Sequence, residues 1–162
     1  MKLALKLAAA LAAAMVVFGV GWLVAVAGVG RAADPASLSD RETAFTERMR
    51  NVVLVGHFTL EGRERRDGLP ERYEISSVTK LDGDRWRFNA RVKYGRVDTT
   101  LPVVVPVVWA GDTPMVSITN VDLPGLGEAF SARVLFYDDR YAGTWDHGNY
   151  GGMMYGTIEH EE

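Results

Sequence analysis

A strict alternation of apolar and polar side chains over residues 85–94 is the feature that most constrains the fold of this 162-residue chain. Every second position is apolar, and the series is Trp86, Phe88, Ala90, Val92 and Tyr94. Successive side chains of a pleated strand point to opposite faces, whereas a helix would spread these side chains around its circumference. The segment is therefore predicted to be a strand with one buried and one solvated face.

Further segments have the same strand-like character, with turn residues between them. The predicted strands are residues 52–60, 73–81, 85–94, 99–109, 115–121, 128–137, 141–146 and 153–159. Asp82-Gly83 separates the second from the third, and an Asp-Gly pair in that place is typical of a type I′ hairpin turn. The other connections are too short for crossover helices, so neighbouring strands are expected to pair antiparallel.

The predicted fold class is all-β, with about eight antiparallel strands in an up-and-down, calycin-like barrel. Eight strands can close around a packed interior or around one small ligand, and closure removes exposed strand edges. A partly open barrel or a two-sheet sandwich is the alternative. Pro102 and Pro106 lie within the fourth strand, and because proline has no N–H to donate to a neighbour, this strand is the expected seam.

A short helix is predicted before the first strand, in a segment of residues 34–51 that otherwise serves as a linker. Ser39 and Glu42 have the spacing of a capping box, and Leu38 lies in the position of a hydrophobic staple. Phe45 and Met49 follow Leu38 at roughly helical spacing and form a narrow apolar stripe. The helix is expected to lie across the mouth or the side of a barrel domain of residues 52–162.

The first 33 residues are expected to direct the protein out of the cytoplasm, as a signal peptide or a membrane anchor. Residues 7–30 carry no charge, and a helix of this length would extend about 36 Å, enough for a hydrocarbon core of roughly 30 Å. Lys2 and Lys6 place its N-terminus in the cytoplasm. Residues 25–27 and 30–32 each offer a small-x-small cleavage site, so cleavage and retention both remain open. The barrel is predicted to be periplasmic, secreted or anchored outside the cytoplasm.

Beyond residue 33 the chain is acidic, with 15 Lys and Arg against 21 Asp and Glu once Lys2, Lys6 and Arg31 are set aside. A nucleic-acid partner is therefore not expected, because phosphate backbones require a surplus of basic side chains. The chain has no cysteine, which excludes disulfides and a lipid-modified cysteine as the anchor.

The polar face of the third predicted strand carries a basic row, which consists of Arg85, Arg87, Arg91 and Lys93. Such a row could dock an anionic polymer or an anionic membrane surface. The simpler interpretation is a solvated outer face, which nearby acidic residues such as Glu71 and Glu74 neutralise across the strand ladder.

Motifs for catalysis or metal binding are weak. No pair among His57, His147 and His160 has metal-ligand spacing, although Asp146-His147 could approach the acidic tail if the last two strands pair. The sequence has no Gly-x-Ser-x-Gly elbow, no cysteine nucleophile and no phosphate-binding loop. No cofactor or metal is therefore expected, and the enzymatic alternative is an extracytoplasmic hydrolase or isomerase that uses Asp146 and His147.

Aromatic side chains on the predicted strands are the main candidates for ligand contacts. The candidates are Trp86, Phe88, Tyr94, Trp109, Phe130 and Trp145. Such side chains either fill a small barrel or line a pocket for a small apolar molecule. The leading hypothesis is an exported, non-enzymatic barrel that binds a small apolar ligand or an envelope protein. A purely structural envelope module is a further alternative.

Two glycine-containing segments carry a resemblance to known proteins. Residues 109–114 read Trp-Ala-Gly-Asp-Thr-Pro, and residues 141–145 read Tyr-Ala-Gly-Thr-Trp, followed by His147-Gly148. Over about residues 45–159 the chain resembles a family of uncharacterised exported bacterial proteins, which implies no activity. Residues 143–145 are also similar to the Gly-x-Trp motif of lipocalin and avidin barrels. In those barrels the motif lies on the first strand, whereas here it comes near the end, so no binding residue is carried over.

Overall fold

The computed structural model describes residues 30–62, 68–94, 97–123 and 127–160. Ala32–Glu162 form one compact unit. The predicted export segment, residues 7–30, lies outside the described residues except for Gly30. Within the described ranges, no helix is both long enough and apolar enough to cross a bilayer.

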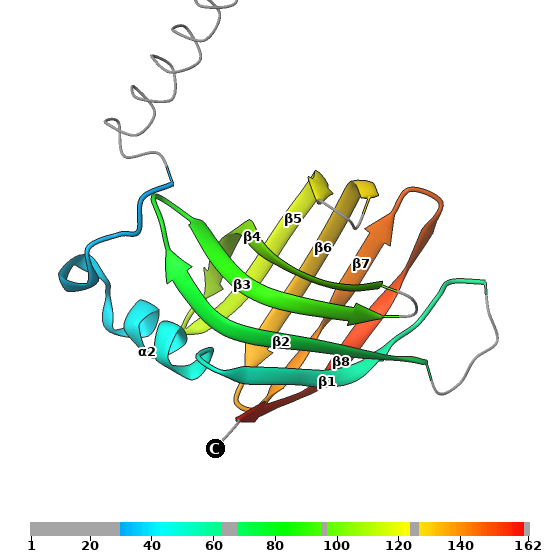
Figure 1. Cartoon of the computed structure of the whole chain (residues 1–162), viewed down its shortest axis with the longest axis horizontal. Helices are drawn as coiled ribbons and strands as arrows, with labels where there is room; N and C mark the ends of the chain where they lie inside the picture. Colours follow the sequence, from blue (N-terminus) through cyan, green and yellow to red (C-terminus); the bar gives the residue numbers. More distant parts are fainter. Residues whose placement is uncertain (1–29, 63–67, 95–96, 124–126, 161–162) are drawn as a thin grey trace, which may run out of the picture. The chain divides into compact units, whose positions relative to one another are not determined.

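Eight antiparallel strands form a closed barrel in which each strand pairs with its neighbours along the chain and β8 pairs with β1 (Figure 1). The strands are β1 (Val52–Phe58), β2 (Leu69–Lys80), β3 (Arg85–Tyr94), β4 (Val97–Ala110), β5 (Thr113–Leu123), β6 (Gly127–Tyr137), β7 (Arg140–His147) and β8 (Tyr150–His160). The predicted up-and-down barrel is confirmed over the partly open barrel and the sandwich. Its alternation works as expected, because Trp86 and Phe88 of β3 are buried while Arg91 and Lys93 of the same strand are exposed.

The seam of the barrel lies at β4, as the prolines predict. β4 pairs with β3 over residues 97–106, but with β5 only over residues 107–110. Pro102 and Pro106 fall in the stretch that pairs with β3 and not with β5. The N–H groups that these prolines lack are therefore not required by the β4–β5 ladder.

The connection from β2 to β3 differs from the predicted type I′ turn. The Leu81 N–H donates to the Arg85 carbonyl and the Arg85 N–H donates to the Asp82 carbonyl, at 2.9 and 3.0 Å. Gly83 has a φ of 57°, and Asp82 and Asp84 do not share this left-handed conformation. A type I′ turn requires positive φ at both central residues, so the prediction was wrong. In this longer connection, Asp82 does not need the strained left-handed conformation that a type I′ turn would require of it.

The predicted helix is confirmed as α2 (Asp40–Arg48), which follows a 3₁₀ turn, η1 (Pro35–Ser37). The Glu42 carboxylate accepts hydrogen bonds from the Ser39 backbone N–H at 2.9 Å and from the Ser39 hydroxyl at 2.8 Å. Glu42 also forms an ion pair with Lys80 of β2. Burial raises the pKa of Glu42, but hydrogen bonds from Lys80 and Ser39 outweigh it and lower the pKa to about 2. The helix start is thus fixed to the barrel wall.

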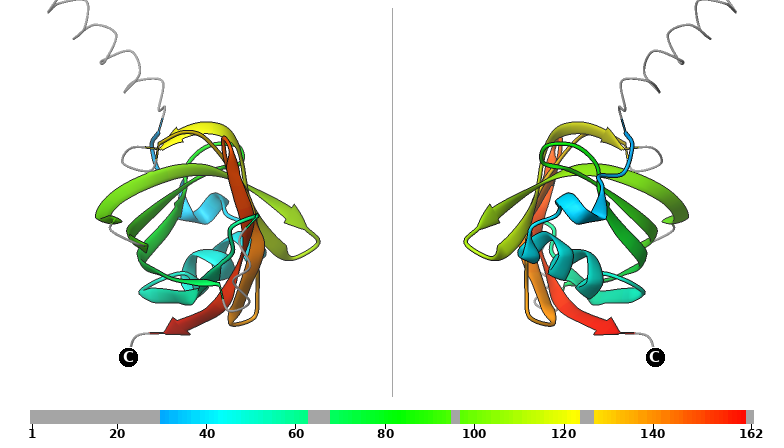
Figure 2. Two further views of the ribbon diagram at one scale, coloured as in Figure 1. Left: turned by 90° about the vertical axis from the view of Figure 1, so that its right-hand side faces the viewer. Right: turned by 90° about the vertical axis from the view of Figure 1, so that its left-hand side faces the viewer.

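α2 closes one end of the barrel (Figure 2). Its residue Phe45 is 4% exposed, and Met49 directly after the helix is fully buried. The Phe45 ring meets Trp86 edge to face at 5.4 Å and Trp109 at 5.8 Å between ring centroids. Edge-to-face aromatic contacts add to the gain from apolar burial. Side chains therefore pack around Phe45 at this end of the barrel.

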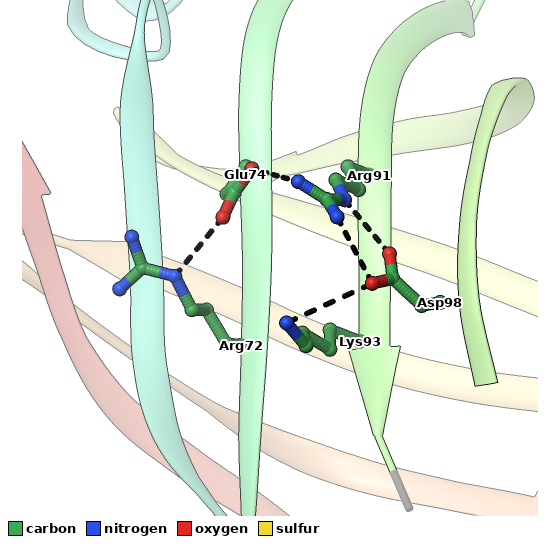
Figure 3. Close-up of polar contacts among 5 residues, drawn as sticks. All are labelled: Arg72, Glu74, Arg91, Lys93 and Asp98. Carbon is green, nitrogen blue, oxygen red and sulfur yellow. Dashed lines mark hydrogen bonds and ion pairs between the residues drawn. The ribbon is translucent and has the colours of Figure 1, made fainter. Parts of the chain in front are cut away.

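The outer face of β2, β3 and β4 carries a network of ion pairs (Figure 3), whose members are Arg72, Glu74, Arg91, Lys93 and Asp98. Arg91 lies 2.7 Å from Asp98 and 3.6 Å from Glu74. Three members of the basic row thus have acidic neighbours, because Arg91 and Lys93 belong to this network and Arg85 pairs with Asp82. The simpler interpretation expects such neighbours. The expectation that Glu71 neutralises this row is wrong, because Glu71 lies on the inward face of β2.

Candidate functional site

A cavity of about 390 Å³ occupies the half of the barrel that α2 does not fill. Most of its wall is apolar and comes from Phe58, Leu60, Tyr73, Val116, Ile118, Phe130, Ala132, Val134, Trp145 and Met154. Glu71, His147 and Tyr150 complete the lining. Tyr150 is 66% exposed, so the cavity opens at the end of the barrel where β7 turns into β8.

The structure divides the sequence-predicted ligand-binding aromatics between the two halves of the barrel. Phe130 and Trp145 line the cavity. Trp86, Phe88 and Trp109 instead pack around Phe45 at the α2 end. Tyr94 pairs with Val97 through its backbone, and its side chain lies outside the described part of the chain. The cavity wall thus holds two of the predicted residues, with Phe58 and Tyr73 as further aromatic members.

Among the described residues, Glu71 is a charged residue that is buried, with 4% exposure. It shares the inward face of β2 with Tyr73 and Ile75, since alternate residues of a strand face the same way. One carboxylate oxygen accepts a hydrogen bond from the Tyr73 hydroxyl and the other accepts one from the Tyr141 hydroxyl, both at 2.8 Å. The cavity therefore has a polar corner within an apolar wall.

Two glycines allow Tyr141 to reach Glu71 from β7. The strand register places Glu71, Gly56, Gly156 and Tyr141 in one row across β2, β1, β8 and β7. A Cβ atom at Gly56 would lie 2.4 Å from the Tyr141 hydroxyl oxygen, and one at Gly156 would lie 2.7 Å from Tyr141 Cε1. The Tyr141 side chain thus lies over two residues that have no side chain. Glycine within a strand often marks such a close approach.

The protonation of this corner follows from its burial. Burial raises the pKa of Glu71, while the hydrogen bonds from Tyr73 and Tyr141 and the nearby charge of His57 oppose the rise. Burial also raises the pKa of Tyr141, and the negative charge of Glu71 adds to the effect. Tyr141 therefore keeps its proton and acts as a donor. Among the described residues, no basic side chain forms an ion pair with Glu71.

Trp145 lines the cavity and carries a further buried polar atom. Its ring packs edge to face against Phe58, with 5.9 Å between centroids. The indole nitrogen Nε1 is buried and has no hydrogen-bond partner among the residues that the structure covers. A buried donor without a partner costs free energy, so native proteins rarely leave one unused.

The structure does not bring the proposed acid and base of a hydrolase together. Asp146 and His147 are consecutive residues of β7, so their side chains leave the strand on opposite faces. His147 lines the cavity, whereas Asp146 is exposed. The suggested approach of His147 to the acidic tail is also wrong. Register places His147 opposite Tyr150, at the cavity mouth, and Glu159 opposite Val53, near the end of the barrel covered by α2.

Sequence reasoning missed the Glu71 corner. The second strand was predicted to start at Tyr73, which left Glu71 in the preceding loop, but β2 starts at Leu69 and includes Pro70. Two signals could have found it: Glu71 continues the phase of Tyr73 and Ile75, and Gly56 and Gly156 lie within strands.

Comparisons of this chain with protein-family models, with curated proteins and with solved structures find no match.

Proposed function

We propose that this protein binds a small, predominantly apolar molecule in the barrel cavity. The observation that supports it most directly is the cavity itself, about 390 Å³ in volume with an apolar lining. Ligand sites of small molecules have volumes from roughly 300 to 1,000 Å³, and they combine apolar walls with a few polar groups that set orientation. Glu71 is such a group here.

A non-enzymatic role is part of this proposal. The acid and base of the hydrolase alternative do not meet, because His147 lines the cavity while Asp146 lies on the opposite face of β7. A general base must reach the proton that it abstracts, directly or through one water. The interior offers a shaped, apolar volume and hydrogen-bonding groups, which is the chemistry of binding.

A cavity-filling substitution tests the proposal. Ala132 lines the cavity and is 5% exposed, so Ala132→Phe would place a ring inside it. Ala142→Phe is the matched control, because Ala142 faces outward on the adjacent strand β7. Prodan, a small uncharged dye with polarity-dependent emission, should bind the wild-type protein and the control equally. Ala132→Phe should weaken this binding at least about tenfold, or about 1.4 kcal/mol. Equal binding by all three proteins would contradict an internal site.

The place of action that we propose is outside the cytoplasm. The support comes from residues 7–30, which are uncharged and are preceded by Lys2 and Lys6. Their length suits a signal peptide or a membrane anchor. A C-terminal alkaline phosphatase fusion should be active in a bacterial host, because this enzyme matures only outside the cytoplasm. Activity that persists after deletion of residues 1–30 would contradict the assignment.

The outer surface favours a second candidate, the binding of an envelope protein. Cross-strand pairs connect a row of apolar residues on this surface, from Val108 through Met115, Leu135 and Ala142 to Tyr155. Leu135 and Tyr155 are 41% and 44% exposed. Contiguous exposed apolar residues are typical of protein interfaces. A photo-cross-linking residue at position 135 should give a discrete adduct in intact cells, whereas one at exposed Asp82 should not. Identical results from the two positions would contradict this role.

A further inference from the structure

We infer that the cavity takes a hydrophobic amine, whose ammonium group donates hydrogen bonds to Glu71 while its apolar body lies against the aromatic wall. This inference rests on the proposed function and specifies the chemical class of its ligand. It depends on the surroundings of the Glu71 carboxylate and on the composition of the wall around it.

The first observation is that Glu71 has unused capacity as a hydrogen-bond acceptor. An ionised carboxylate can accept about four hydrogen bonds. Glu71 receives one on each oxygen, from Tyr73 and from Tyr141. Both tyrosine hydroxyls donate, which stabilises the ionised carboxylate against the burial that raises the pKa of Glu71. A ligand group that carries two or three N–H donors could use the acceptor sites that remain.

The second observation is that no basic side chain among the described residues forms an ion pair with Glu71. A buried carboxylate in apolar surroundings is unfavourable unless a positive group or several hydrogen bonds compensate it. The described lining of the cavity contains no lysine or arginine, and His147 and Glu71 are its ionisable side chains apart from tyrosines. His57, the other histidine near Glu71, is exposed on the neighbouring strand β1. A cationic ligand would supply the charge that the described wall does not contain.

The third observation is the aromatic character of the wall. Phe58, Tyr73, Phe130 and Trp145 all line the cavity. The faces of aromatic rings attract cations, and an ammonium group gains most from them when it is desolvated. A carboxylate together with aromatic faces therefore selects an ammonium group over a neutral polar group. The same carboxylate would repel the head group of a fatty acid.

Three probes with one ring system separate the alternatives. The probes are 1-naphthylmethylamine, 1-naphthalenemethanol and 1-naphthoate, which differ in a cationic, neutral or anionic end group. Binding to the full-length protein is measured by calorimetry at about pH 8, where the amine is protonated and where the high pH favours ionisation of Glu71 against the burial that raises its pKa. The amine is expected to bind at least about tenfold more tightly than the alcohol, and the naphthoate is expected to bind most weakly.

Two variants assign the preference to Glu71. Glu71→Gln should weaken binding of the amine about tenfold or more and leave binding of the alcohol within about threefold. Glu71→Asp keeps the charge and should retain most of the preference for the amine. If Glu71→Gln loses the fold, the order of the three probes on the wild-type protein still decides, because an amine that binds no better than the alcohol overturns the inference.

Each outcome separates this inference from the proposed function. If the alcohol binds and Ala132→Phe abolishes its binding, the cavity is a ligand site. In that case, an amine that binds the wild-type protein no more tightly than the alcohol overturns the amine assignment alone. The same holds if the amine binds Glu71→Gln as tightly as it binds the wild-type protein. If none of the probes binds, both the site and its ligand class are wrong.

Discussion

Replacement of Phe45 by alanine should strongly destabilise the barrel, because α2 supplies this ring to close one end of its core. Phe45 is 4% exposed, and its ring lies 5.4 Å from Trp86, 5.8 Å from Trp109 and 6.0 Å from Phe136 between centroids. Truncation of a buried Phe to Ala costs about 3–5 kcal/mol in well-packed cores. We expect about 3–4 kcal/mol, since a surface helix can relax part of the way into the space.

Urea denaturation followed by tryptophan fluorescence measures this loss, because Trp86 and Trp109 contact the deleted ring. At about 4 °C for each kcal/mol, the melting temperature should fall by roughly 12 °C or more. Tyr155→Ala is the control, as Tyr155 is 44% exposed, and it should cost less than about 1 kcal/mol. A loss below about 1 kcal/mol for Phe45→Ala would refute the reasoning and would make α2 a peripheral strap.

Other predictions concern the glycine row, the helix cap and the outer face. Gly156→Ala should lower the free energy of unfolding, measured by urea denaturation, by about 2 kcal/mol or more, because its Cβ would lie 2.2 Å from the Val55 carbonyl oxygen. Thr144→Ala, at an exposed position, is the control and should leave this free energy nearly unchanged. Equal losses in the two variants would contradict the close approach. The pKa of Glu42 is lowered to about 2 from 4.5, so its stabilising contribution is complete above pH 4.5 and is lost as pH falls towards 2. Glu42→Gln should therefore reduce this acid dependence in equilibrium unfolding, and an unchanged dependence would count against the Lys80 and Ser39 contacts. Arg91→Ala should lower the melting temperature only slightly, and less at high salt, because Arg91 is 46% exposed; a large, salt-independent loss would be inconsistent with a solvated network.

Alternation and capping were sufficient to predict the architecture. In β3, polar residues alternate with Trp86 and Phe88, and only a strand places such a series on one face. Ser39 and Glu42 predicted the start of α2 because capping is a local interaction. Pro102 and Pro106 likewise located the seam through the donors that they lack.

The site was less predictable because it depends on register between distant strands. Tyr141 reaches Glu71 only because Gly56 and Gly156 fall in the same row, and their separation in sequence gives no local signal. The division of the aromatic residues has a similar origin. Which of them face the cavity depends on which end α2 fills, and the apolar stripe of Phe45 and Met49 fits either end. Trp145 and Trp86 thus look alike in sequence but lie in different halves of the barrel.

The most direct test of a ligand site in the open half of the barrel is a crystal structure of the protein with 1-naphthylmethylamine bound. The ring should lie between Phe130 and Trp145, and the amine nitrogen should lie about 2.7–3.0 Å from a carboxylate oxygen of Glu71. A ligand bound only on the outer face, with the interior closed by side chains, would contradict the account.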